Sequence, residues 1–107
     1  MKLFVDLNAD LGEGSGHDNE LFELISSASI ATGFHAGDSD TMHAAVWAAK
    51  EHGVAVGAHP SFFDRENFGR KELKMSNEEV FDAVAYQLGI FQAIASALDV
   101  RPNHVKP

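Results

Sequence analysis

Short apolar runs alternate with longer helical patterns along this chain, and that alternation restricts its fold more than any other feature. Four runs are predicted to be β-strands, at residues 3–7, 30–34, 54–58 and 104–106. A helical pattern separates each run from the next. Nearly continuous apolar strands that alternate with helices are typical of a parallel sheet covered by helices. The predicted fold class is therefore α/β, and the pattern fits both an open doubly wound sheet and a parallel β/α barrel.

Capping residues mark the ends of the helical patterns. The first pattern covers residues 20–26, and either Ser39 or Asp40 is predicted to be the cap of the second. The third begins at Ser76, where the sequence Ser-Asn-Glu-Glu has the spacing of a capping box, and it ends at Pro102. Its apolar residues recur at helical spacing, which predicts one face packed on the sheet.

Composition and charge exclude several classes of function. Sixteen acidic residues against eight basic ones give a formal net charge of -8, which argues against a nucleic-acid partner. The chain has no cysteine, so it has neither disulfides nor thiolate zinc ligands, as is usual in a reducing compartment. We see no secretion signal and no run of about 20 apolar residues. We therefore expect a cytoplasmic protein that binds neither nucleic acid nor membrane.

The 107 residues are enough for one domain and too few for two. The last strand candidate has no helix after it to cover it. We therefore expect residues 1–107 to be a single unit that forms the amino-terminal part of a larger β/α barrel.

Polar side chains stand on or after three of the predicted strands. Asp6, Asn8 and Asp10 alternate along the chain and so share one face, while His35 and His59 follow the second and third runs. Because α/β proteins bind ligands at the carboxyl ends of their strands, we expect these five residues to converge there. Asp10, His35 and His59 could hold a divalent metal that activates water. A metal-free acid–base set is equally compatible with these residue types.

Two loops lie next to this predicted site. Residues 12–16 are rich in glycine but lack the lysine of a phosphate-binding loop, so they are a weak nucleotide motif. Residues 61–73 contain aromatic side chains and Arg70. This second segment is either a loop anchored by Phe62 or Phe68, or a substrate lid in which Arg70 binds a carboxylate or phosphate.

The order of several short motifs resembles that of a known family. The motifs are Asp-Leu-Asn-Ala-Asp-Leu-Gly-Glu-Gly at 6–14, Gly-Phe-His-Ala-Gly-Asp at 33–38, Gly-Ala-His-Pro-Ser at 57–61, Phe-Gly-Arg at 68–70, Tyr-Gln at 86–87 and His-Val-Lys-Pro at 104–107. They resemble the LamB/YcsF family from one end of the chain to the other, and they match the amino-terminal part of a typical member. One departure is Thr32, where members usually have cysteine.

The resemblance implies a parallel β/α barrel similar to those of glycoside hydrolases and deacetylases, with this chain as its first three to four β/α units. It also implies the A component of a 5-oxoprolinase, which uses ATP to hydrolyse the lactam 5-oxoproline (pyroglutamate) to glutamate together with subunits B and C. We interpret four residues as the catalytic acid–base or metal set: Asp6, Asp10, His35 and His59. Five others are interpreted as binding substrate or phosphate: Asn8, Glu13, Asp38, Arg70 and Lys106.

Two other functions stay open at this point. The first is a metal-dependent, deacetylase-like amide hydrolase acting on N-acyl sugars, which bound zinc and independence of ATP would favour. The second is a non-catalytic accessory subunit that presents a cleft to its partners. Loss of activity of the complex on His35→Ala would exclude the accessory role.

Overall fold

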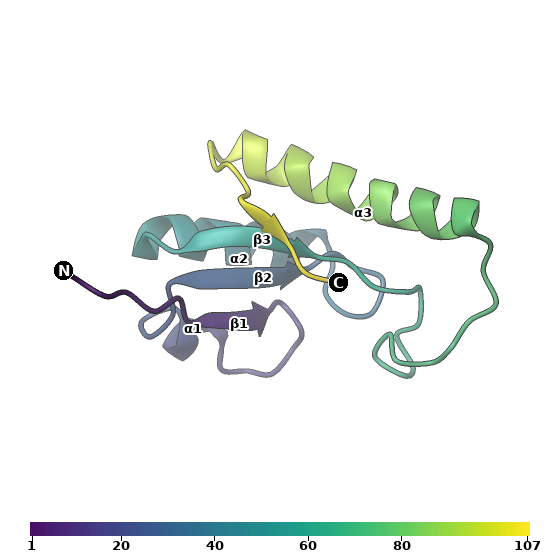
Figure 1. Ribbon diagram of the computed structural model, residues 1–107, viewed down its shortest axis with the longest axis horizontal. Coiled ribbons are helices and arrows are strands. Elements are labelled where there is room, and N and C mark those ends of the chain that lie inside the picture. The colour runs from purple at the N-terminus through teal and green to yellow at the C-terminus, as the bar shows by residue number, and fades with distance from the viewer.

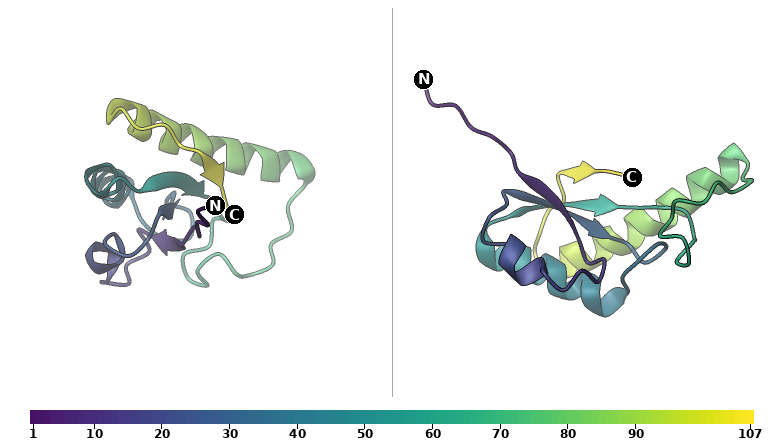
Figure 2. Two further views of the ribbon diagram at one scale, coloured as in Figure 1. Left: turned by 60° about the vertical axis from the view of Figure 1, so that its left-hand side comes forward. Right: turned by 90° about the horizontal axis from the view of Figure 1, so that it is seen from below.

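The computed structural model describes all of residues 1–107 as a four-stranded parallel sheet with its helices on one face (Figures 1 and 2). The strands pair in the order of the chain: β1 (Asn8–Leu11), β2 (Ser27–Ala31), β3 (Ala55–His59) and β4 (His104–Val105). The connecting helices are α1 (Asp18–Leu21), α2 (Ser39–His52) and α3 (Asn77–Ala97). The α/β class and the parallel sheet predicted from the sequence are confirmed.

The two faces of the sheet differ in chemistry. Alternate residues point toward the helices and form an apolar core, which includes Leu11, Ile30 and Val56 of the strands with Val46 of α2 and Phe91 of α3. The intervening residues carry polar groups to the opposite face, which no helix covers (Figure 2): Asn8, Asp10, Ser27, Ser29, His59 and His104.

The polar face is concave. Lys106, directly after β4, places its Nζ 2.7 Å and 2.9 Å from the two carboxylate oxygens of Asp10 on β1. In a flat sheet, strands three positions apart are separated by about 14 Å, which these two side chains cannot span. The sheet therefore curls toward its polar face, as expected for part of a β/α barrel.

The first two strands differ in position from those predicted. β1 begins after residues 3–7 rather than covering them, and β2 ends at Ala31 instead of extending over 30–34. Residues 1–7 form no strand, although the carbonyl of Leu7 accepts hydrogen bonds from the backbone N–H groups of Ser26 and Ser27. The prediction failed because it sought continuous apolar runs, whereas these strands carry polar residues on their concave face.

The N-cap of the second helix lies one residue before the two predicted candidates. Asp38 is its N-cap, and not Ser39 or Asp40, because the Asp38 carboxylate accepts a hydrogen bond from the backbone N–H of Thr41 at 2.8 Å. Gly53 ends the helix in the left-handed conformation, at φ 67°. The first helix, α1, is a four-residue turn that begins and ends earlier than the predicted 20–26 pattern.

The third helix begins as predicted. Ser76 and Glu79 form the capping box, with hydrogen bonds of 3.1 Å and 2.9 Å between their side chains and each other's backbone N–H groups. By length and composition α3 could also cross a membrane, contrary to our expectation that no segment would reach that limit. One such helix is weak evidence, and α3 packs on β3 and α2 with Gln87, Phe91 and Ala95 buried.

Candidate active site

A polar cavity of about 230 Å³ lies at the carboxyl ends of the strands. Each of the four β/α units contributes to it. The side chains that matter for its chemistry are Asp10 of β1, Glu13 of the following loop, His35 after β2, His59 at the end of β3, Arg70 of the next loop and Lys106 after β4. The expectation that His35 and His59 meet at this end of the sheet is confirmed.

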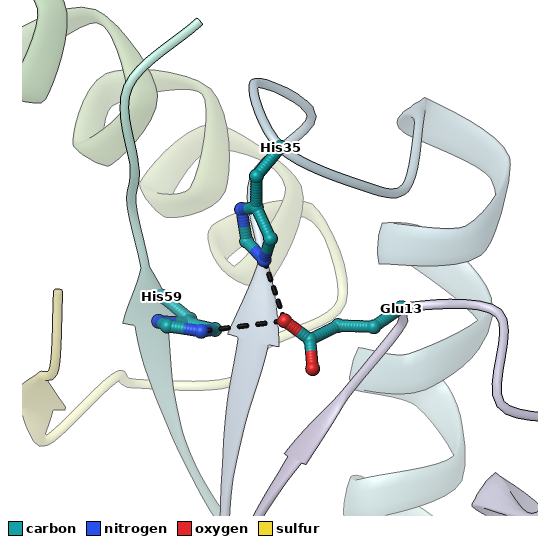
Figure 3. A group of neighbouring side chains, drawn as sticks. All are labelled: Glu13, His35 and His59. Atoms are coloured by element: carbon teal, nitrogen blue, oxygen red, sulfur yellow. Dashed lines mark hydrogen bonds and ion pairs between the residues drawn. The ribbon is translucent and has the colours of Figure 1, made fainter. Parts of the chain in front are cut away.

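Glu13 lies between the two histidines (Figure 3). Its Oε2 is 2.5 Å from His35 Nε2 and 3.3 Å from His59 Nε2. The imidazole rings stand edge to face, with their centroids 4.8 Å apart. The histidine side chains are 2% and 12% exposed and that of Glu13 is 14% exposed, so all three are largely shielded from solvent. In such surroundings charge–charge interactions are stronger than in water.

A backbone carbonyl determines which ring nitrogen of neutral His59 carries the hydrogen. Its Nδ1 lies 2.6 Å from the carbonyl oxygen of Lys106, and because a carbonyl only accepts, Nδ1 carries the hydrogen. In the neutral ring Nε2 is then an acceptor that faces another acceptor, the Glu13 carboxylate. A proton or a cation between these two atoms removes the repulsion. The pair is therefore suited to accepting and releasing a proton, or to holding a metal.

His35 has the opposite arrangement. Its Nε2 donates to Glu13, while its buried Nδ1 has no hydrogen-bond partner. When the neutral ring donates from Nε2 to Glu13, its Nδ1 carries no hydrogen, so the only unpaired group is an acceptor. If His35 instead bound a metal through Nε2, the hydrogen of the neutral ring would lie on Nδ1. A buried N–H group would then have no acceptor, which is costly.

The residues that fit a metal differ from those predicted. Nε2 of each histidine and a carboxylate oxygen of Glu13 lie within 4.8 Å of one another, and two histidines with one carboxylate are a common set of zinc ligands. Asp10 is not part of this group, because both of its carboxylate oxygens bind the Lys106 ammonium group. The prediction named Asp10 with the two histidines, whereas the three groups close enough to share an ion are Glu13, His35 and His59, with the unpaired His35 Nδ1 as the cost of such binding.

The mouth of the cavity carries an uncompensated positive charge. The guanidinium group of Arg70 lies 5.1 Å from the centroid of the Phe68 ring, and Phe68 in turn packs edge-on against His35. Arg70 forms no salt bridge, unlike Lys106. Its five N–H donors are therefore available to an anionic ligand.

The sequence matches the LamB/YcsF family over residues 5–107. This chain belongs to the LamB/YcsF family. Among solved structures, the crystal structure of the lactam utilization protein from Thermus thermophilus is similar, with a TM-score of 0.94 and 50% sequence identity. The match covers 98% of this chain and 44% of that one, so the chain spans less than half the length of that protein.

Two of the predicted site residues of this LamB/YcsF chain lie below the cavity. Asp6, before β1, accepts hydrogen bonds from the hydroxyl groups of Ser26 and Ser27, which lower the pKa of its carboxyl group. Asn8 lies one layer nearer the cavity and binds the hydroxyl groups of Ser27 and Ser29 at 2.8 Å and 3.1 Å. The expectation that Asp6 and Asn8 converge with the histidines is wrong.

Asp38 also lies outside the cavity. Hydrogen bonds from the backbone and side chain of Thr41 lower the pKa of its carboxyl group and occupy it as the cap of α2. The Gly-Asp motif of the LamB/YcsF chain therefore begins a helix here.

The loop at residues 61–73 is anchored to the rest of this LamB/YcsF chain. Arg65 donates from Nη2 to the carbonyl oxygens of Gly33 and Gly37 on either side of His35. Within the loop, Asp64 accepts hydrogen bonds from its neighbours, and Phe68 adopts a left-handed conformation with φ 57°. Hydrogen bonds from Arg65 thus tie the loop to the segment around His35, which favours the anchored loop over a free lid. Sequence reasoning misses Arg65, because an exposed arginine has no distinctive signal.

Proposed function

We propose that this LamB/YcsF chain carries the lactam-opening site of a 5-oxoprolinase, as its A component acting with subunits B and C and with ATP. The observation that supports this most is the Glu13 carboxylate held between the imidazoles of His35 and His59 at the carboxyl edge of the sheet. The similar protein from Thermus thermophilus is described as a lactam utilization protein, which agrees with a cyclic amide as substrate.

The cavity matches the groups that 5-oxoproline carries. The substrate has one carboxylate and one ring amide, and the free guanidinium group of Arg70 is placed to bind the carboxylate. Binding at the mouth would direct the ring amide toward Glu13 and His59. The ammonium group of Lys106, held by Asp10, adds positive charge near the oxygen of the amide, where negative charge develops as water attacks.

The reaction then needs a group that takes a proton from water and returns it to nitrogen. In the net reaction ATP and two water molecules convert 5-oxoproline to glutamate, ADP and phosphate. ATP transfers its terminal phosphoryl group to the lactam oxygen and leaves as ADP. One water oxygen then bonds to the ring carbon as the C–N bond breaks and the ring nitrogen leaves as an amine, and the second water releases the phosphoryl group as phosphate, which completes the new carboxylate. Glu13 and His59 accept the water proton and supply one to the nitrogen, while His35 orients Glu13 through its Nε2–H donor.

The test is turnover by the full protein together with its partner subunits, measured as release of ADP and glutamate from 5-oxoproline. We expect Glu13→Gln and His35→Ala to lower kcat by about 10² to 10⁴. His43→Ala, at an exposed position on α2, is the matched control and should retain the parent rate. Parent-rate turnover by folded Glu13→Gln and His35→Ala would refute the proposal and favour the accessory role.

The second candidate is a metal-dependent amide hydrolase, and one observation favours it. His59 donates from Nδ1 to a backbone carbonyl, an arrangement typical of metal-binding histidines, and its Nε2 faces Glu13. Titration of the purified full protein with Zn²⁺, followed by calorimetry and elemental analysis, tests it. One ion per chain, lost in His59→Ala, together with amide hydrolysis without ATP, would establish this candidate. Absence of bound metal and a strict need for ATP would exclude it.

A further inference from the structure

Gln87 is a fully buried amide in the middle of the apolar face of α3. A buried amide is costly unless its hydrogen bonds are satisfied, and this one uses its full capacity. Its Oε1 accepts from Thr32 Oγ1 at 2.8 Å and from the backbone N–H of Ser61 at 2.9 Å. Its Nε2 donates to the carbonyl oxygens of Ser61 and Ala83, both at 2.9 Å.

The partners of Gln87 are the two strand ends that carry the site histidines. Thr32 directly follows β2 and precedes the loop of His35. Ser61 follows β3 and the His59-Pro60 pair. The Thr32 hydroxyl also lies 3.3 Å from the carbonyl oxygen of His59. One side chain of α3 therefore links the backbones that fix the separation of the two imidazole rings.

Gln87 and Thr32 do not line the cavity. The Thr32 side chain is buried and directed at Gln87, so it has no access to a substrate.

We propose that Gln87 is a positioning residue that sets the distance between His35 and His59 by clamping the ends of β2 and β3 to α3. This proposal rests on the function proposed above. In a well-organised site a displacement of about 1 Å lowers the rate by about 10². Loss of the clamp should therefore lower kcat by a larger factor than it raises KM, because the clamp bonds to the strand ends of the two histidines, whereas the Arg70 guanidinium lies over Phe68 and has no hydrogen bond to Gln87.

The experiment compares Gln87→Leu with Gln92→Leu in the full protein with its partner subunits, using kcat per folded molecule. Gln92 is an exposed glutamine on the same helix, and its amide bonds only to Ser96. We expect Gln87→Leu to lower kcat about tenfold to a hundredfold and Gln92→Leu to leave it unchanged. Thr32→Val removes one bond of the clamp and should lower kcat by a smaller factor. Thr32→Ser keeps the hydroxyl group and should turn over at close to the parent rate.

If Gln87→Leu does not fold, the Thr32 pair decides the matter. Unchanged kcat per folded molecule in Thr32→Val, or in Gln87→Leu with only a lower Tm, would overturn the proposal and leave Gln87 a structural residue. His35→Ala, run in the same assay, distinguishes failure of the proposed function from failure of the positioning role of Gln87. If His35→Ala also turns over at the parent rate, the proposed function fails, and the positioning role fails with it.

Discussion

Gly57 on β3 leaves the space that the His104 ring occupies on the concave face. A Cβ atom at position 57 would lie 2.5 Å from His104 Cε1 and closer still to Cδ2 and Nε2, which is nearer than such atoms can approach. The ring crosses β3 at this point and binds Ser29 Oγ on β2 through Nε2 at 3.1 Å. Gly57→Ala must therefore displace the imidazole and break this hydrogen bond.

Three contributions determine how much Gly57→Ala changes the free energy of unfolding. Overpacking costs about 1–3 kcal/mol, and the lost hydrogen bond costs about 1 kcal/mol. Replacing glycine in a strand returns about 0.5–1 kcal/mol, because alanine has less backbone freedom to lose on folding. We expect Gly57→Ala to lower the free energy of unfolding by about 1–3 kcal/mol.

Urea denaturation of the full protein, followed by circular dichroism, measures this change. In a His104→Ala background the space is empty, so Gly57→Ala should be neutral or stabilising by up to about 1 kcal/mol. The coupling in this double-mutant cycle should be about 2–4 kcal/mol, because overpacking and the lost hydrogen bond both require the His104 ring. An equal effect of Gly57→Ala in both backgrounds would refute the reasoning.

Three further substitutions have defined outcomes. Ser76→Ala removes the N-cap of α3 and should lower the free energy of unfolding by about 1 kcal/mol in urea; an unchanged midpoint would contradict the assigned cap. The pKa of Asp6 is lowered from its ordinary value of 3.8 in the folded protein. The stabilisation of the fold by the ionised Asp6 is therefore complete above pH 3.8 and is lost as the pH falls through the lowered pKa. Unfolding of Asp6→Asn should thus depend less on pH in this acidic range, and an identical profile would argue against the serine hydrogen bonds. Arg65→Met should increase deuterium uptake in residues 61–73, because it removes the donors to Gly33 and Gly37; unchanged uptake would show that the loop is held by other contacts.

The third helix is easier to predict from the sequence than the first two strands. The capping box at Ser76 is local, and the apolar face of α3 extends over several turns, so its position follows from neighbouring residues alone. For β1 and β2 the useful signal is alternation, with Asn8 and Asp10 or Ser27 and Ser29 on one face. A concave polar face cannot be recognised from one strand, since it forms only when the sheet curls.

The site was predicted in part for a similar reason. His35 and His59 follow strands, and the rule that strand ends converge was enough to bring them together. Glu13 was interpreted as a substrate-binding residue, yet it is the group that both imidazoles contact. The only local signal for its role is its place between two glycines just after β1. The contact of the Lys106 carbonyl with His59 has no signal in the sequence, because any residue could supply it.

The hydrogen bond from His59 to Lys106 also means that the site cannot be completed until late in the synthesis of this segment. The two residues are 47 positions apart, and Lys106 is 96 positions from its other partner, Asp10. At about 5–20 residues per second, a ribosome needs roughly 2–10 s to synthesise the segment between His59 and Lys106. During that interval the nascent chain already contains Glu13, His35 and His59, but the carbonyl that orients His59 does not yet exist. His59 therefore acquires the orientation seen here only after the fourth strand has been made and has docked.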